Sequence, residues 1–274
     1  MSHKKAIIIV SFGTVNDTVR SACIESVENK VKDNFPGDEV RRAFTSNFII
    51  KKLSERQIYV DTLPEALEKL KSEGYQDVII QSTHLTPGEE YRNKILVVAN
   101  AYKHEFNSLV VGRPVLMFDG GNHTSDDFLI ALQAVRTQIY CNQADTEVVF
   151  MGHGSPHQHN PAYELLQKKF DEQKENITVG VLEESDYPNI KDVLARLAGK
   201  QNIKKIILMP FLLVAGNHVV HDMTGEQEAS WKNILVKAGY HVELYLHGLG
   251  ENEAFQDIYV QHIKDVIVNR NEKY

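Results

Sequence analysis

Cysteine is scarce in this chain, and its scarcity limits how the fold can be cross-linked and how a metal can be held. Only two cysteines, Cys23 and Cys141, occur among 274 residues, and they form no C-x-x-C pair. Disulfide-stapled folds and structural zinc sites use several closely spaced cysteines. The sequence therefore argues against a disulfide framework and a thiolate metal site, and it favours a reducing compartment.

Long apolar runs are missing as well. The run nearest the N-terminus, Ala6–Val10, is interrupted by Ser11-Phe12-Gly13-Thr14. It is too short for the core of an export signal or for a helix that crosses a bilayer. We interpret it as a buried first strand and expect a cytoplasmic protein without a membrane segment.

An excess of positive charge is also missing, since 30 Lys and Arg face 37 Asp and Glu, a net charge of -7. Proteins that bind nucleic acids or anionic membranes usually carry basic surfaces. We therefore expect no nucleic acid and no membrane as partner. With 42% hydrophobic and 24% charged residues, the composition is that of an ordinary globular protein. The sequence leaves the oligomeric state open.

Short apolar runs rich in valine and isoleucine recur along the chain, separated by stretches of helical periodicity. Runs of this length without alternation are typical of parallel strands that helices cover on both faces. The sequence therefore predicts an α/β fold that closes with an amphipathic helix at about residues 251–270. The predicted strands include Ala6–Val10, Val78–Ile80, Val148–Met151, Ile206–Met209 and Val242–Leu246.

The chain also contains an internal repeat. Residues 7–14 align with residues 148–155, which places Phe12 on His153. Residues 78–90 align without a gap with residues 206–218, which places Glu90 on His218. Chance similarity between buried strands is the alternative, but a strand, a loop glycine and a polar residue coincide each time. The repeat predicts two related lobes.

We place the boundary between the lobes in a stretch rich in glycine, asparagine, serine and aspartate, around residues 119–127. The predicted lobes are residues 1–125 and 126–274, each with a parallel sheet flanked by helices. We expect the terminal helix of the second lobe to pack back onto the first.

Five of the twelve histidines fall in two groups directly after predicted strands: His153, His157 and His159, and then His218 and His221. Ligands of doubly wound sheets bind at the carboxyl ends of strands, so both groups can face one crevice. Glycines on both sides of His153 permit a tight turn and close approach of a ligand. The roles of His157, His159 and His221 stay open, because a hydrogen-bonded loop residue explains each equally well.

Carboxylates follow a third predicted strand, where Thr178–Leu182 leads into Glu183 and Glu184. Imidazole nitrogen and carboxylate oxygen suit divalent cobalt, nickel, iron or zinc. The pattern predicts a divalent-metal site at His153, His218 and a strand-end carboxylate. Glu90 joins the candidates because it matches His218 in the repeat.

Several motifs, spread in order over nearly the whole chain, point to one family. They are Ser11-Phe12-Gly13-Thr14, Arg42–Ser46, Gln81-Ser82-x-His84, Gly88-x-Glu90-Tyr91, Met151–Gly154, Leu213–His218 and Gly248–Asn252. The set resembles the anaerobic sirohydrochlorin cobaltochelatases of the CbiK family.

The resemblance implies a class II chelatase, which has the two-lobed α/β fold of ferrochelatase, a cleft between the lobes and no nucleotide cofactor. The metal ligands that it implies are His153, His218 and Glu183, because the family's carboxylate after a Val-Gly-x-x strand falls on Glu183. Glu184 is the alternative. The resemblance also places Glu90 and His84 at family positions of the first lobe, although the role of His84 stays open. We expect catalytic roles for His153, His218 and Glu90, and substrate-binding roles for Ser11, Phe12, Thr14, His84 and Arg42.

The implied reaction inserts Co²⁺ into sirohydrochlorin in the early-cobalt route of cobalamin biosynthesis, with the metal as a substrate. We expect the two histidines to hold the ion and to accept protons that leave the ring. Insertion of Fe²⁺ or Ni²⁺ by the same fold is one alternative, and Zn²⁺ would fit the same ligands. A non-enzymatic metal or tetrapyrrole carrier is another. A metal-dependent hydrolase is a third, although no G-x-S-x-G motif accompanies it.

Overall fold

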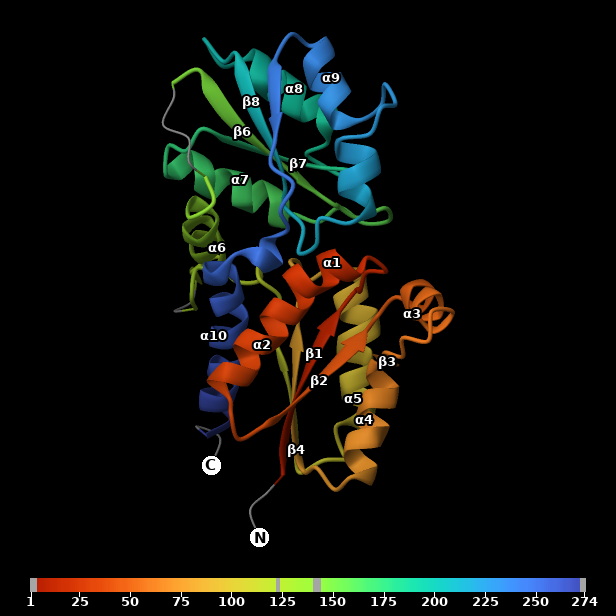
Figure 1. Cartoon of the computed structure of the whole chain (residues 1–274). Helices are drawn as coiled ribbons and strands as arrows, with labels where there is room; N and C mark the ends of the chain where they lie inside the picture. The colour runs from red at the N-terminus through yellow and green to blue at the C-terminus, as the bar shows by residue number, and fades with distance from the viewer. Residues whose placement is uncertain (1–3, 122–123, 140–143, 272–274) are drawn as a thin grey trace. The chain divides into compact units, whose positions relative to one another are not determined.

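A computed structural model describes residues 4–121, 124–139 and 144–271 (Figure 1). The chain forms two compact units: Met1–Met117 together with Phe255–Tyr274, and Phe118–Ala254. Each unit contains one parallel sheet flanked by helices, which confirms the predicted fold class. The predicted lobe boundary between residues 125 and 126 stays a prediction.

The sheet of the first unit has the strand order β3-β2-β1-β4-β5, and all neighbouring pairs are parallel. The valine and isoleucine residues in the middle of the central strands, residues 7–10 in β1 and residues 78–80 in β4, are buried, as expected for parallel strands covered on both faces. The bounds are β1 Lys5–Ser11, β2 Glu39–Phe44, β3 Asp61–Thr62, β4 Asp77–Ser82 and β5 Ser108–Gly112.

Helices cover both faces of this sheet: Figure 1 shows α4 and α5 on one face and α2 and α10 on the other. The helix α4 begins at a capping box in which Thr62 and Glu65 satisfy each other's backbone N–H groups. The helical segments are α1 Asp17–Val19, η1 Arg20–Glu25, α2 Ser26–Asn34, α3 Asn47–Ser54, α4 Leu63–Ser72, η2 Tyr91–Leu96, α5 Val97–Tyr102 and α10 Glu253–Asn271.

The terminal helix α10 belongs to the first unit through buried contacts. The hydroxyl of Tyr259, itself fully buried, donates a hydrogen bond of 3.0 Å to the backbone oxygen of Thr83. The carboxylate of Asp265 pairs with Arg113 at 2.6 Å. Because Thr83 lies just after β4, α10 supports the loop that carries His84.

The sheet of the second unit has the order β7-β6-β8-β9, again with all pairs parallel. Its apolar core includes Val149 and Leu208 from the strands and Val193 and Trp231 from the helices. The bounds are α6 Asp127–Arg136, β6 Thr146–Gly152, α7 Ala162–Glu172, β7 Ile177–Val181, α8 Ile190–Ala198, β8 Lys205–Pro210, η4 Val219–Met223, α9 Trp231–Lys237, β9 His241–Leu244 and η5 Leu249–Glu251.

The predicted repeat is confirmed by strand register. Ala6 pairs with Val78 in the first sheet, and the aligned residues Glu147 and Ile206 pair in the second. The strand order β2-β1-β4-β5 has its counterpart in β7-β6-β8-β9.

Among the helices of the described residues, none combines the length and the apolar character needed to cross a bilayer.

Candidate functional site

The site in the second unit begins where β6 and β7 end side by side. His153 and Glu183 follow these strands, and the backbone N–H of Glu183 donates to the backbone oxygen of His153 at 3.1 Å. Gly154 has a φ of 81°, and a Cβ added there would lie 2.9 Å from Cβ of Val181. Only glycine lets the two loops approach so closely, which explains the glycine after His153.

His218 reaches the same edge from the loop after β8 and precedes the first residue of η4. The rings of His153 and His218 meet edge to face, with centroids 4.8 Å apart and planes at 88°. A carboxylate oxygen of Glu183 lies 3.9 Å from Nδ1 of His153. The structure therefore places His153 beside each of the two other predicted metal ligands, His218 and Glu183.

The Nδ1 atoms of both histidines are engaged by oxygen atoms. Nδ1 of His153 lies 3.1 Å from the backbone oxygen of Gly154, and Nδ1 of His218 lies 2.8 Å from a carboxylate oxygen of Asp222. Because these oxygens only accept hydrogen bonds, both contacts favour the neutral tautomer that carries its proton on Nδ1 and leaves the lone pair on Nε2. The sequence interpretation missed Asp222, although its spacing of four residues from His218 is the spacing of helical neighbours.

In their present rotamers, these side chains do not form a complete metal-coordination site. In the described part of the chain, no three His, Cys, Asp or Glu side chains are close enough together to hold a metal ion. The side chains of His153, Glu183 and His218 are 42%, 30% and 49% exposed, so they have room to change rotamer. Glu184 is exposed, and the contact to His153 is made by Glu183.

A buried carboxylate holds the two loops of this site together. The side chain of Asp186 accepts hydrogen bonds of 2.8 Å from the backbone N–H groups of Ser155 and Tyr187. His159 bridges Asp186, at 2.8 Å, and Glu164, at 2.7 Å, and the bond to Asp186 raises the pKa of this histidine. His159 therefore has a structural partner on each ring nitrogen, whereas His157 and His221 are exposed.

In the first unit, the predicted substrate-binding residues Ser11 and Thr14 are buried, and their hydroxyl groups are hydrogen-bonded to nearby protein groups. The hydroxyl of Ser11 accepts a hydrogen bond of 2.9 Å from the hydroxyl of Thr83. The hydroxyl of Thr14 accepts one of 3.3 Å from the backbone N–H of Asn16. Both side chains shape the loop after β1, and their contact with substrate stays a prediction.

The ring of Phe12 is free to contact a substrate, whereas the guanidinium of Arg42 is held in ion pairs. The ring of Phe12 is 51% exposed beside the edge where β1 ends. The guanidinium of Arg42 binds Glu28 through Nε, at 2.7 Å, and through Nη2, at 2.6 Å, and it also contacts Glu25. The role of Arg42 in binding substrate stays a prediction, and these ion pairs do not support it.

His84 and Glu90 each have a buried polar atom without a hydrogen-bond partner in the described residues, Nε2 of His84 and Oε2 of Glu90. Nδ1 of His84 lies 3.0 Å from the hydroxyl of Ser82, and burial lowers the pKa of His84 to about 4. His84 is therefore neutral at pH 7. Buried polar atoms without partners are rare, and a binding site is one reason for them.

The repeat places the two sets of residues in equivalent positions. Glu90 directly precedes the π-helix η2, as His218 directly precedes the π-helix η4. The backbone N–H of Ser46 donates to the oxygen of Phe12 at 3.3 Å, as that of Glu183 donates to the oxygen of His153. The counterparts of His153, Glu183 and His218 are thus Phe12, Ser46 and Glu90. Single π-turns frequently mark functional positions.

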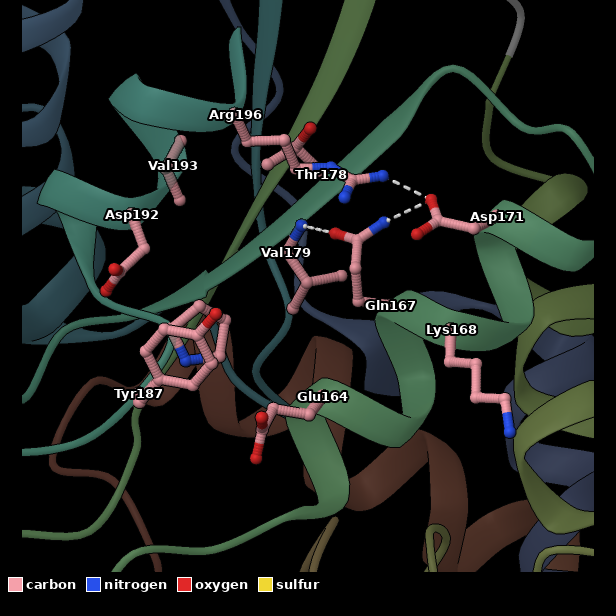
Figure 2. A pocket seen from close by; sticks show the side chains of 11 residues that line it. Glu164, Gln167, Lys168, Asp171, Thr178, Val179, Tyr187, Asp192, Val193 and Arg196 are labelled. Carbon is pink, nitrogen blue, oxygen red and sulfur yellow. Dashed lines mark hydrogen bonds and ion pairs between the residues drawn. The ribbon is translucent and has the colours of Figure 1, made fainter. Parts of the chain in front are cut away.

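A separate hollow of about 300 Å³ lies between α7, α8 and the outer edge of β7 (Figure 2). Gln167 closes that edge, because its side chain accepts from the N–H of Val179 at 2.7 Å and donates to the oxygen of Ile177 at 3.0 Å. Arg196 is paired with Asp171 across the hollow. These bonds account for Gln167 and for the pair of Arg196 with Asp171, whereas Nε of Arg196 has no hydrogen-bond partner within the described residues.

Comparison with known proteins gives a consistent result. The family model "Cobalt chelatase (CbiK)" matches residues 5–268. A protein of Salmonella typhimurium named "Sirohydrochlorin cobaltochelatase" is 36% identical over 96% of this chain and 97% of its own length. A protein of Nitratidesulfovibrio vulgaris named "Sirohydrochlorin cobaltochelatase CbiKC" is 32% identical over 95% of this chain and 89% of its own length.

Solved structures agree in fold. SirB from Bacillus subtilis with Fe³⁺ has a TM-score of 0.63 and 15% identity, and covers 99% of this chain and 98% of its own. The sirohydrochlorin chelatase SirB from Bacillus subtilis subspecies spizizenii in complex with cobalt has a TM-score of 0.57 and 12% identity over the same shares. At these identities the likeness concerns the fold.

The choice between Glu183 and Glu184 can be tested with two charge-matched variants. Because Glu183 faces His153, we expect Glu183→Gln to weaken Co²⁺ binding by at least about tenfold, a loss typical of changes beside a metal. Glu184→Gln removes the same charge from an exposed position, so a change below about threefold is expected. Titration of the protein with Co²⁺, followed by absorption, measures both. The reverse order of effects would assign the ligand to Glu184.

The partly buried His84, whose Nε2 is shielded from solvent, is expected to give the folded chain a pH-dependent stability. Between about pH 6.5 and about pH 4 the unfolded chain binds a proton at this residue that the folded chain excludes, so stability falls as the pH falls. Lowering the pH from 7 to 5 should cost about 2 kcal/mol through His84.

Urea unfolding of wild type and His84→Asn at pH 7 and pH 5 measures this contribution. Asparagine can keep a contact with Ser82 but does not titrate, so the variant should lose less stability on acidification. His104→Asn, at an exposed position, is the control and should follow wild type. An equal loss in wild type and His84→Asn would show that His84 does not titrate in this way.

Proposed function

The chain belongs to the cobalt chelatase (CbiK) family, and on this premise we propose that it inserts Co²⁺ into sirohydrochlorin without ATP. This lyase reaction belongs to the anaerobic route of cobalamin biosynthesis. The match over residues 5–268 confirms the resemblance seen in the motifs. The observation that carries the assignment to a site is the juxtaposition of His153, His218 and Glu183 at one edge of the second sheet.

A divalent metal ion is one substrate of the reaction, and we propose His153, His218 and Glu183 as its ligands. Two neutral imidazoles and one carboxylate bind first-row divalent ions, and the names of two relatives support Co²⁺ as the physiological one. The same ligands would also accept Ni²⁺, Fe²⁺ or Zn²⁺. Partly exposed ligands favour exchange, which suits an ion that is bound only until it is transferred.

Insertion of M²⁺ into sirohydrochlorin forms bonds from the metal to four ring nitrogens and releases two protons from ring N–H groups. As the ion leaves His153 and His218, their Nε2 atoms become free to accept these protons. We propose Glu90 as a further acceptor, because its Oε2 is buried and has no hydrogen-bond partner within the described residues.

We propose that Phe12 contacts the macrocycle, because an exposed aromatic ring can stack on an extended π-system. His84 is neutral at pH 7, so it would bind a rim carboxylate through a hydrogen bond and not through charge. The cleft between the lobes and the cytoplasmic location stay predictions, and the oligomeric state stays open.

An anaerobic insertion assay tests the proposed function. Purified protein is mixed with sirohydrochlorin and Co²⁺, and the absorption spectrum of the ring reports insertion, with Fe²⁺, Ni²⁺ and Zn²⁺ in parallel. We expect saturable acceleration by Co²⁺ above the uncatalysed rate. The variants His153→Ala and His218→Ala should lower it by at least about 100-fold, as expected when groups that act directly in a reaction are removed.

The exposed His104 provides the matched control, because His104→Ala removes an imidazole far along the sequence from the proposed ligands. Its rate should equal that of wild type. Binding of Co²⁺ without any acceleration would overturn the enzymatic proposal and identify the chain as a metal carrier. Faster insertion of Fe²⁺ or Ni²⁺ than of Co²⁺ would reassign the metal.

A further inference from the structure

The contact between His218 and Asp222 gives this site a feature beyond its three proposed ligands. Nδ1 of His218 lies 2.8 Å from a carboxylate oxygen of Asp222, four residues further along the chain. Asp222 lies in the π-helix η4, which begins directly after His218. The backbone that presents the histidine therefore also presents its partner.

The contact with Asp222 influences which ring nitrogen of a neutral His218 carries the proton. One ring nitrogen carries the proton and the other carries the lone pair that binds a metal, and the hydrogen bond decides which is which. A carboxylate only accepts hydrogen bonds, so Asp222 fixes the proton on Nδ1 of His218. The lone pair of Nε2 is then available before any ion arrives.

His153 reaches the same tautomer by different means. Its Nδ1 lies 3.1 Å from the backbone oxygen of Gly154, an acceptor that no side-chain substitution removes. The tautomer of His218 depends on one side chain, and that side chain is only half-buried. In both rings, whose centroids lie 4.8 Å apart, Nε2 is the nitrogen left to bind a metal. A side-chain substitution can remove the hydrogen-bond acceptor of His218 but not that of His153.

The charge of Asp222 also matters for a divalent ion. Two neutral imidazoles and the carboxylate of Glu183 bring one negative charge to an ion that carries two positive charges. Asp222 adds a second negative charge one imidazole away from the ion. Such carboxylate–histidine–metal arrangements raise the basicity of the ligand and fix its orientation.

A second histidine–carboxylate pair of the same spacing, His247 and Glu251, lies beside a tyrosine ring. Nδ1 of His247 lies 2.7 Å from a carboxylate oxygen of Glu251, and the ring of His247 contacts Tyr245. The pair alone is therefore no sign of a metal site. What distinguishes His218 is that its ring packs against that of His153, which in turn faces Glu183.

We propose that Asp222 is a positioning residue, which holds His218 in the tautomer and orientation that bind Co²⁺ through Nε2. The proposal rests on the proposed function only in the choice of metal and of ligands. It predicts an effect on metal binding that is separate from any effect on insertion.

The test compares Asp222→Ala, Asp222→Asn and the control Glu226→Ala, which removes one negative charge from an exposed site four residues further on. Asp222→Ala should raise the Kd for Co²⁺, measured without sirohydrochlorin, by about 10- to 100-fold. Its KM for Co²⁺ should rise in parallel, while its KM for sirohydrochlorin stays that of wild type. Asp222→Asn should recover only part of the affinity, because asparagine keeps an acceptor oxygen but lacks the negative charge and brings an N–H donor that can reverse the tautomer. Glu226→Ala should bind like wild type.

A spectroscopic readout separates positioning from a general structural role. Long-range ¹H–¹⁵N NMR of the metal-free protein should show His218 with its proton on Nδ1 in wild type, and a shift toward the Nε2-protonated form in Asp222→Ala. Wild-type Kd and an unchanged tautomer in Asp222→Ala would overturn the proposal, as would an equal loss in Glu226→Ala. If wild type binds Co²⁺ but does not insert it, the proposed function fails, while the Kd values still decide the role of Asp222.

Discussion

Parallel pairing of β6 with both β7 and β8 is the constraint on which the candidate site depends. Because parallel strands all end at the same edge of a sheet, the three loops that follow them begin next to one another. His153, Glu183 and His218 each occur within a few residues of such a strand end or on the loop that leaves it. The backbone bond between Glu183 and His153 and the glycine at position 154 then draw two of these loops into contact.

The same backbone occurs in the first unit with different side chains. The hydrogen bond from Ser46 to Phe12 repeats the bond from Glu183 to His153, and the π-helices after Glu90 and His218 begin at matching positions. In the second unit these positions carry two imidazoles and a carboxylate. In the first they carry a phenyl ring, a hydroxyl and a carboxylate, of which only Glu90 resembles a metal ligand. This asymmetry is the physical basis for assigning metal binding to the second unit.

The sequence was sufficient to predict the two related sheets, because buried parallel strands leave runs of valine and isoleucine and because strand, glycine and polar residue recur together. It was also sufficient to single out His153, His218 and a carboxylate near residue 183. It could not predict how polar side chains pair across the fold. Arg42 has its partners on η1 and α2, His159 has one partner 27 residues away, and each of these choices depends on packing between elements. The contact of Asp222 with His218 could have been predicted from the sequence, because residues four apart in a helix lie side by side.

We propose that His153 and His218, each protonated on Nδ1, bind Co²⁺ through Nε2 together with Glu183. Anomalous diffraction at the cobalt absorption edge from crystals soaked in Co²⁺ tests this most directly. We expect one peak about 2.1 Å from Nε2 of both histidines, with an oxygen of Glu183 completing the ligands from the protein. A peak at Nδ1 of either ring, or at a different set of residues, would contradict it.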